Sequence, residues 1–119
     1  MYLPMKMLQD LERLTREEKL VLERCRDAIR AVDLSADVIL YGSRARGDDE
    51  ATSDYDLLVL IDGEASLEKE DIICRQLYPI ELETGKVLLA MVYSRQQWDA
   101  PLYRAMPFHM NVERDGVRV

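Results

Sequence analysis

Apolar and polar residues along this 119-residue chain follow helical spacing in some stretches and form strand-like runs in others, which predicts a mixed fold. The N-terminal stretch, residues 5–32, is rich in Leu, Glu, Lys and Arg, a composition typical of helices. Its capping-box pattern Thr15-Arg-Glu-Glu18 predicts a short first helix, followed by a main helix over residues 16–32. The main helix carries an apolar stripe at helical spacing, made of Val21, Cys25, Ile29 and Val32.

Three apolar runs predict three strands, over residues 37–41, 54–61 and 86–93. The turn signal Asp62-Gly63 ends the second run. The third run is almost continuously apolar, so we expect it to be buried on both faces of the sheet.

Capping residues and prolines predict the remaining helices. Ser66 is a good N-cap for a helix that runs through Leu77, and Pro79 is expected to end or kink that helix because proline removes an intrahelical hydrogen bond. Ser94-Arg-Gln-Gln97 is a second capping-box pattern, which opens a short helix around Trp98. Gly85 and Gly116 are predicted to end helices, and Pro101 and Pro107 to begin short ones. Residues 117–119 are predicted to form a brief edge strand.

This order of elements predicts an α/β (α+β) fold, with a small mixed β-sheet flanked by helices. Residues 1–119 are enough for a single domain with a modest core. Within it we expect N-terminal helices over 1–36, the sheet and motif core over 37–94, and short helices over 95–119. The aromatic residues of this tail are expected to dock onto the domain. His109 has no Cys or acidic cluster at ligand spacing and is interpreted as a surface or interface residue.

Composition narrows the class of protein. The net charge of −7 and a pI of about 4.7 argue against direct nucleic-acid binding and fit a metal-loaded site or a basic protein partner. No apolar run approaches the length of a membrane span, and the N-terminus lacks the layout of a signal peptide. The two cysteines have no metal-type spacing, so a reduced, cytoplasmic protein is expected.

The clearest chemistry lies in a Gly-Ser pair after the first predicted strand and two aspartates at the start of the second. Asp54 and Asp56 stand at positions i and i+2, so their side chains project from the same face of the strand. Neighbouring carboxylates repel each other unless a cation lies between them, and Mg²⁺ takes one or two carboxylates with phosphates completing its shell. Gly42 and Ser43 supply close backbone approach, N–H groups and a hydroxyl for phosphate. Together these residues predict a metal–triphosphate site.

The string Tyr41-Gly42-Ser43, a spacer from Arg44 to Ser53, and Asp54-Tyr55-Asp56-Leu57 resembles the motif of the DNA polymerase β-like nucleotidyltransferase superfamily. Within it, Arg44-Ala45-Arg46-Gly47 and Ser53 also match the minimal nucleotidyltransferases. The resemblance is detailed over residues 38–61 and looser toward the C-terminus. It implies the nucleotidyltransferase fold, Asp54 and Asp56 as catalytic metal ligands of a two-metal Mg²⁺ site, and ATP or another nucleoside triphosphate as substrate.

Arg44 and Arg46 are candidates for the triphosphate, because a planar guanidinium can pair two oxygens at once. The resemblance places a short helix over residues 44–48, with its N-terminus facing the phosphates. In a helix the two arginines stand at i and i+2 and cannot share one face. We assign Arg44 to phosphate and Arg46 to a structural or partner role.

The resemblance also implies a third carboxylate, on the strand after the second helix. Here that strand reads Val87-Leu-Leu-Ala-Met-Val-Tyr93, and every alignable position is apolar. Glu81 and Glu83, just upstream, are the nearest candidates for a carboxylate from elsewhere. Their alternative interpretation is that they are solvated residues near a helix end.

Two functions of different class follow. The first is a Mg²⁺-dependent nucleotidyltransferase that transfers a nucleoside monophosphate, AMP from ATP, to a hydroxyl. Because the chain holds no second domain for an acceptor, we expect the acceptor on a partner protein. In the minimal group this resemblance implies a helical HEPN-type partner, a toxin–antitoxin pair and modification of a partner tyrosine.

The second function is a catalytically weak or inactive module of the same fold that neutralises a partner by binding, which the missing third carboxylate favours. A free-standing enzyme acting on a small alcohol or a tRNA end is a third interpretation, disfavoured by size and acidity. Assembly with further copies of the same chain stays open.

Overall fold

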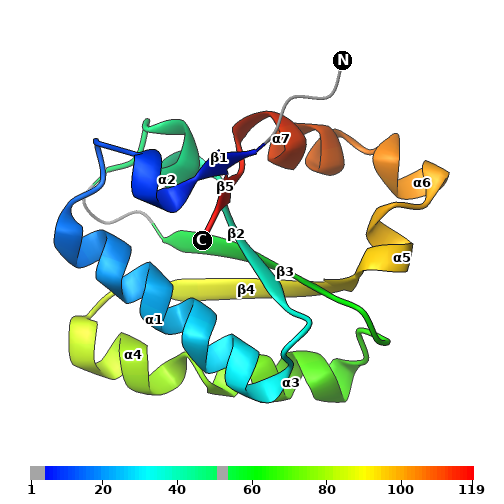
Figure 1. Ribbon diagram of the computed structural model, residues 1–119, viewed down its shortest axis with the longest axis horizontal. Coiled ribbons are helices and arrows are strands. Elements are labelled where there is room, and N and C mark those ends of the chain that lie inside the picture. The colour runs from blue at the N-terminus through cyan, green and yellow to red at the C-terminus, as the bar shows by residue number, and fades with distance from the viewer. Residues whose placement is uncertain (1–4, 51–53) are drawn as a thin grey trace.

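The computed structural model describes residues 5–50 and 54–119. Its strands are β1 Lys6–Met7, β2 Asp37–Tyr41, β3 Tyr55–Ile61, β4 Leu88–Ser94 and β5 Val117–Arg118. In the described residues they form one mixed sheet with the order β1-β5-β2-β3-β4 (Figure 1). β2 is antiparallel to its neighbours β3 and β5, whereas β3 is parallel to β4 and β1 to β5. The motif therefore lies in the middle of the sheet, where β2 ends and β3 begins.

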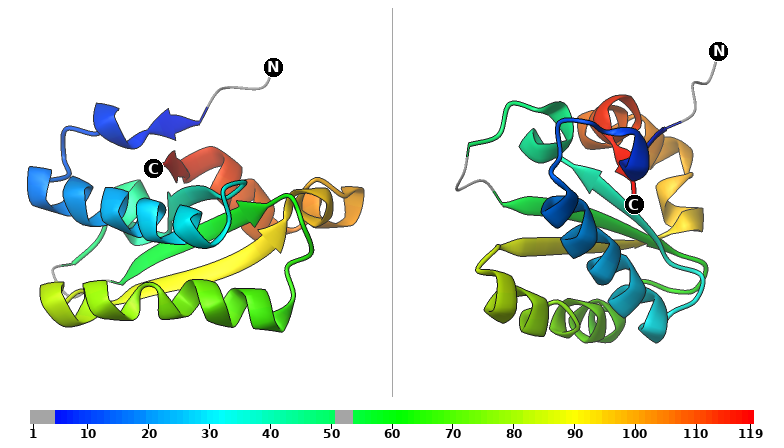
Figure 2. Two further views of the ribbon diagram at one scale, coloured as in Figure 1. Left: turned by 60° about the horizontal axis from the view of Figure 1, so that its bottom comes forward. Right: turned by 60° about the vertical axis from the view of Figure 1, so that its left-hand side comes forward.

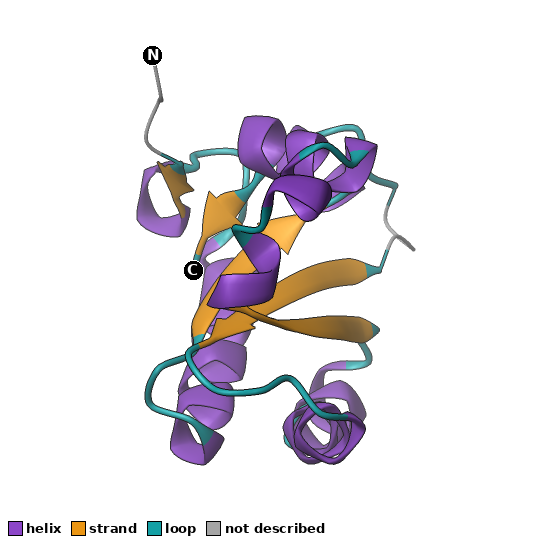
Figure 3. Ribbon diagram, turned by 90° about the vertical axis from the view of Figure 1, so that its right-hand side faces the viewer, coloured by secondary structure: helices purple, strands orange, loops and turns teal. Residues whose placement is uncertain are grey.

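Helices cover both faces of this sheet. The helices on one face are α1 Arg16–Val32, α3 Leu67–Arg75 and α4 Tyr78–Thr84, and Figure 2 shows α1 alongside the α3–α4 pair. The short helices α5 Arg95–Trp98, α6 Pro101–Arg104 and α7 Pro107–Asp115 lie on the other side of β3 and β4 from α3 and α4 (Figure 3). A 3-10 turn, η1 Leu8–Asp10, and the short helix α2 Ser43–Arg46 complete the described elements. None of the described helices is long and apolar enough to cross a membrane.

The core follows from alternation along the central strand. Leu57, Val59 and Ile61 of β3 are fully buried in the cluster that contains α1, α3 and α4. Leu58 and Leu60 point the other way and pack in a smaller cluster with residues of α5 and α7. Because β3 is covered on both faces, its run is apolar at every position after Asp56, and the burial of these side chains is the main stabilising term for the fold.

The sequence predicts most of these elements. Helix α1 spans the predicted residues, and the Thr15 capping box forms: the Thr15 hydroxyl accepts from the N–H of Glu18, while the Glu18 carboxylate accepts from the N–H of Thr15. α3 ends before Pro79, which lies in the first turn of α4. The predicted short first helix is wrong. Lys6 and Met7 instead pair with β5, and only a 3-10 turn follows.

The prediction that the third strand is buried on both faces is also wrong. β4 is the last strand of the sheet, and the side chains of Val87, Leu89 and Met91 are 46%, 47% and 40% exposed. Leu88 and Val92, which point to the α1 side, are buried as expected. An apolar run therefore identified the strand correctly, but it could not indicate that one face of its first half is left open.

Side chains from α3 and α4 occupy the free edge of β4. The N–H of Leu88 donates to Glu81 Oε2 at 3.0 Å, and the N–H of Val92 donates to Glu70 Oε2 at 3.4 Å. Between them the thiol of Cys74 donates to the carbonyl oxygen of Ala90 at 3.8 Å. An edge strand whose polar groups are already satisfied is a poor template for another strand. The edge of β4 is thus protected within the chain.

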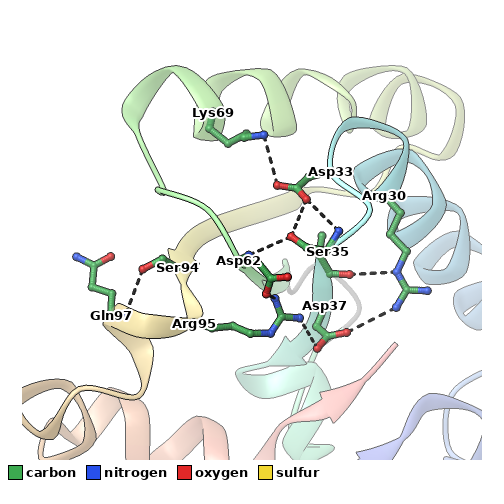
Figure 4. Close-up of polar contacts among 10 residues, drawn as sticks. Arg30, Asp33, Ser35, Asp37, Asp62, Lys69, Ser94, Arg95 and Gln97 are labelled. Carbon is green, nitrogen blue, oxygen red and sulfur yellow. Dashed lines mark hydrogen bonds and ion pairs between the residues drawn. The ribbon is translucent and has the colours of Figure 1, made fainter.

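A polar network closes the end of the sheet that lies opposite the motif (Figure 4). Arg95, at the start of α5, donates to Asp37 Oδ2 at 2.7 Å and to Asp62 Oδ1 at 2.8 Å, so it joins the beginning of β2 to the end of β3. Arg30 of α1 donates to the carbonyl oxygen of Ala36 at 3.1 Å. These contacts fix the α1–β2 connection and the ends of the central strands away from the motif.

The aromatic tail docks onto the sheet, as predicted. Trp98 is 3% exposed, and Phe108 packs edge-on against it with ring centroids 5.8 Å apart. The prediction for His109 is wrong: its side chain is buried and stacks on Trp98 at a centroid distance of 4.2 Å. α7 folds back over α5, and this packing, which the sequence does not reveal, turns position 109 inward.

Candidate active site

The turn between β2 and α2 brings the two halves of the motif into contact. Gly42 has φ of 76° and ψ of −158°, a backbone conformation that residues with a side chain rarely adopt. A Cβ atom at this position would lie 2.5 Å from Oδ2 of Asp56, so the Asp56 carboxylate packs directly against the Gly42 backbone. Ser43 follows at once as the first residue of α2. Backbone amides, a hydroxyl and a carboxylate therefore meet in one small region.

Asp56 lies on the face of the sheet that the alternation predicts, and Asp54 is the exposed residue just before β3. Tyr55 between them points into the α1 core, and Asp56 stands in register with Tyr41 of β2 and Leu89 of β4. Burial raises the pKa of Asp56, and the charge of nearby Asp54 raises it further, while Arg46 lowers it. The negative charge of Asp54 thus disfavours the ionised form of Asp56, which is the situation that a bound cation relieves.

A comparison of this chain with known protein families identifies the family to which it belongs. The pattern of the nucleotidyltransferase domain matches residues 19–92, a stretch that includes Gly42, Ser43 and both aspartates. The protein belongs to the nucleotidyltransferase domain family. The resemblance found in the sequence and the predicted mixed α/β fold are thereby confirmed. A comparison with curated proteins found no match.

Arg44 of this nucleotidyltransferase domain is a buried residue that points away from the phosphate turn. Its side chain is 10% exposed, and its Nη1 atom lies 3.1 Å from Asp49 Oδ2 and 3.4 Å from Glu18 Oε2. Its guanidinium carbon also lies 4.2 Å from the centre of the Tyr55 ring, in a cation–π contact. The structure therefore favours a structural role for Arg44, where the sequence had suggested phosphate binding.

Arg46 has the environment that was expected for Arg44. Its side chain is 45% exposed, and its Nε donates to the exposed carboxylate of Asp48 at 3.2 Å. Arg46 also lines a pocket with Gly42, and its charge acts on Asp56. The surroundings of the two arginines therefore favour Arg46 over Arg44 as the side chain nearer the motif, the opposite of the sequence-based preference. Helix geometry required them to diverge, but only the packing of α2 shows which one faces the motif.

Tyr55 and Glu18 support the motif from the back of the sheet. Tyr55, the middle residue of Asp-Tyr-Asp, is 1% exposed, and its hydroxyl donates to Glu18 Oε2 at 2.9 Å. Burial, and then the bond to Glu18, raise the pKa of Tyr55 to about 12. Burial also raises the pKa of Glu18, but hydrogen bonds from Thr15 and Tyr55 outweigh burial and hold it below its ordinary range. The first turn of α1 is thereby tied to the strand that carries both aspartates.

This support was not predicted from the sequence, although one signal of it was present. A residue between two outward-facing aspartates must point to the opposite face, where a tyrosine hydroxyl needs a partner. The identity of the partner, Glu18, could not be read from spacing because the two residues are 37 positions apart. Glu18 was noted only as the end of a capping box, a role that it also fulfils.

Arg13 is a second supporting residue that sequence reasoning missed. Its Nη2 donates to the carbonyl oxygen of Arg44 at 2.8 Å and also to that of Ala45. A cation at the carbonyl end of a helix satisfies groups that the helix leaves unpaired. Gly47, which ends α2 with φ of 87°, lets this guanidinium approach, since a Cβ there would lie 2.9 Å from Arg13 Nε. Arg13 thus fixes the short α2 from its far end.

The third carboxylate suggested by the resemblance is not supplied by Glu81 or Glu83. Both lie on α4, which covers the face opposite to Asp56. Glu81 accepts from the edge of β4, and Glu83 forms an ion pair with Arg24 of α1 at 2.5 Å. The residue of β4 that is in register with Asp56 is Leu89. Closeness in sequence made the two glutamates candidates, and the sheet separates them from the motif.

The donor set fits Mg²⁺ as an ion held jointly by the protein and a nucleotide. Within residues 5–50 and 54–119, no group of three or more His, Cys, Asp or Glu side chains could hold a metal ion by itself. Mg²⁺ is commonly bound through one or two carboxylates plus substrate phosphates, and Asp54 and Asp56 are the residues that would supply those carboxylates. Ser53, which matches the minimal pattern, lies outside the described residues.

Proposed function

We propose that this protein is a Mg²⁺-dependent nucleotidyltransferase that transfers AMP from ATP to a hydroxyl group of a partner protein. Membership of the nucleotidyltransferase domain family supports nucleotidyl transfer as the reaction class. The observation that carries the proposal is the contact of the Asp56 carboxylate with the Gly42 backbone, at the start of α2. This contact supports the proposal because it brings a carboxylate that could hold a metal next to a turn whose backbone could bind phosphate, the two parts that a metal-bound triphosphate needs.

The residues of the chain would bind, orient and neutralise the nucleotide. Ser43 and the first turn of α2 would contact the terminal phosphates, and Arg46 would pair two of their oxygens. Asp54 and Asp56 would hold Mg²⁺, which when bound stabilises the charge on the attacking and leaving oxygens. The acceptor oxygen forms a bond to the α-phosphorus, the bond between that phosphorus and the bridging oxygen breaks, and pyrophosphate leaves with the electron pair. The proton of the acceptor passes to water or to a base of the partner.

A protein is the acceptor that the open face of the sheet suits best. Beside Asp56 this face presents Leu89 and Met91, which are 47% and 40% exposed. The hydroxyl of Tyr41 donates weakly to the sulfur of Met91 at 3.4 Å, so this surface is apolar with few polar groups to bind a sugar. A tyrosine of a helical HEPN-type partner, in a toxin–antitoxin pair, fits such a surface. That assignment rests on the resemblance to minimal nucleotidyltransferases.

A second candidate function is a catalytically weak or inactive module that neutralises a partner by contact. The register of Leu89 with Asp56 favours it, because a leucine stands where a third carboxylate would complete a two-metal site. The two candidates differ in what they require. Neutralisation by contact does not need Asp54 or Asp56, whereas transfer of AMP needs both.

The test is to purify the protein together with its partner, add ATP and Mg²⁺, and measure the intact mass of each chain. We expect the partner to gain the mass of one AMP, and we expect Asp54→Asn and Asp56→Asn to abolish the gain. Asp71→Asn, an exposed carboxylate of α3, is the matched control and should leave the gain unchanged. Neutralisation of the partner without any mass change, surviving both active-site substitutions, would establish the contact module instead.

A further inference from the structure

A pocket of about 210 Å³ lies beside the phosphate turn, between α2 and the last helix. Gly42 and Arg46 form its wall on the side of the motif. The opposite wall comes from α7, and the full lining is Tyr41, Gly42, Arg46, Phe108, Asn111, Val112 and Asp115. Pockets that enclose a whole drug-sized ligand measure about 300–1,000 Å³. A space of this size holds one part of a nucleotide rather than all of it.

The pocket is continuous with the motif. Gly42 is at once part of its wall and the residue against which the Asp56 carboxylate packs. The charge of Arg46 acts on Asp115, in the opposite wall of the pocket. The pKa of Asp115 is held low mainly by its hydrogen bonds from Arg114, and Arg46 lowers it further. A nucleotide whose phosphates lie at Gly42 and Ser43 would therefore have this pocket directly within reach.

The chemistry of the α7 wall suits a nucleoside better than a phosphate. The carboxylate of Asp115 is paired with Arg114, and the remaining lone pairs of its oxygens can accept hydrogen bonds from the hydroxyls of a ribose. Phe108 and Tyr41 meet edge to face, with ring centroids 5.3 Å apart, and offer aromatic surface against which a base can pack. The α7 wall thus combines polar groups and aromatic surface, the two kinds of contact that a nucleoside can use.

Asn111 is the residue on this wall that can read a base. It is exposed on α7, and no hydrogen bond joins its side-chain amide to another described residue, so the amide is available to a ligand in the pocket. A carboxamide carries both an acceptor and a donor, and this pair complements the amino group and the ring nitrogen of adenine. The amide thereby distinguishes adenine from guanine, which presents two acceptors on the same edge.

We propose that the pocket between α2 and α7 binds the nucleoside half of the substrate, and that Asn111 selects adenine. This inference rests on the proposed function, since it concerns the same nucleotide. It adds a base-recognition site on a helix outside the Gly-Ser and Asp-Tyr-Asp motif. It also gives α7, which lies beyond the residues 19–92 of the family match, a direct part in binding.

The experiment compares three ligands in the presence of Mg²⁺: α,β-methylene-ATP, which cannot be turned over, its guanosine counterpart, and inorganic tripolyphosphate. Tripolyphosphate probes the motif alone, whereas the two nucleotides probe the motif and the pocket together. Asn111→Ala should weaken the binding of the ATP analogue by about 5- to 150-fold, because a good bidentate contact is worth about 1–3 kcal/mol. The binding of tripolyphosphate should stay unchanged. Arg46→Ala is the control and should weaken the binding of all three ligands.

The outcomes separate this inference from the proposed function. If tripolyphosphate binds but Asn111→Ala leaves the preference for the ATP analogue over the guanosine analogue unchanged, the inference is overturned while the proposed function stands. If the wild-type protein binds none of the three ligands, both are overturned. Because Asn111 is exposed, its variant should unfold at the wild-type temperature, and a melting curve verifies that lost binding is not lost folding.

Discussion

The different surroundings of Arg44 and Arg46 in α2 predict different outcomes for the same substitution at the two positions. Arg44→Ala removes a guanidinium that contacts Glu18 and Asp49 and lies over the Tyr55 ring. Arg46→Ala removes a guanidinium that is 45% exposed and that pairs with the exposed carboxylate of Asp48. The substitutions are chemically identical and lie two residues apart. Only their surroundings differ, so any difference in outcome reports those surroundings.

The structure sets the expected magnitudes. Removing one partner of a buried ion pair costs about 3–5 kcal/mol. The side chains of Glu18 and Asp49 are 16% and 23% exposed, so solvent screens the loss and the lower end, about 3 kcal/mol, applies to Arg44→Ala. For a chain of this length, that loss lowers the melting temperature by about 12 °C. Arg46→Ala should cost less than about 1 kcal/mol, as exposed pairs do.

Binding should show the opposite order. Urea unfolding followed by the fluorescence of buried Trp98 measures stability, and titration with tripolyphosphate and Mg²⁺ measures the motif. We expect Arg44→Ala to be the less stable variant, with binding retained at temperatures where it is folded. We expect Arg46→Ala to be stable and to bind poorly. An Arg44→Ala protein that is as stable as the wild type but has lost tripolyphosphate binding would refute the reasoning.

Three further predictions concern the motif and its support. Gly42→Ala should destabilise the fold by about 1–3 kcal/mol and abolish nucleotide binding, because its Cβ would clash with Asp56; unchanged urea unfolding with unchanged binding would contradict this contact. Leu89→Asp adds a carboxylate in register with Asp56, so it should lower the melting temperature without Mg²⁺ and raise it more than in the wild type when Mg²⁺ is added; a variant indifferent to Mg²⁺ would contradict the register. Burial raises the pKa values of Cys25 and Tyr55 from ordinary values of 9.0 and 10.0 to about 12, so stability should be full below pH 9 and fall between pH 9 and pH 12, where the unfolded chain ionises first. Urea midpoints measured across that range should fall less steeply in Tyr55→Phe, and a flat wild-type profile would show that these groups are not buried as described.

The parts of the site that were predictable from sequence depend on local geometry. Gly42 and Asp56 carry their signal in spacing and strand alternation, and both properties survive folding unchanged. The same is true of α1, whose capping box at Thr15 fixes where the helix begins. Each of these features is decided by residues within a few positions of one another.

The parts that failed depend on which elements pack together. Arg44 is buried because Glu18 and Tyr55, from two other elements, converge on it. Glu81 is close to β4 in sequence but reaches its edge from the α1 face, and His109 is buried because α7 folds over Trp98. No spacing rule contains this information, since each contact joins segments whose relative placement is set by the whole core.

We propose that Gly42, Ser43, Asp54 and Asp56 form one site for a metal-bound triphosphate. The most direct test is calorimetric titration of α,β-methylene-ATP into the wild type, Asp54→Asn and Asp56→Asn, each with Mg²⁺ and with a chelator. Binding by the wild type that requires Mg²⁺, and its loss in both variants with unchanged melting temperatures, is the predicted result. Equal binding by all three proteins, with or without Mg²⁺, would contradict the claim.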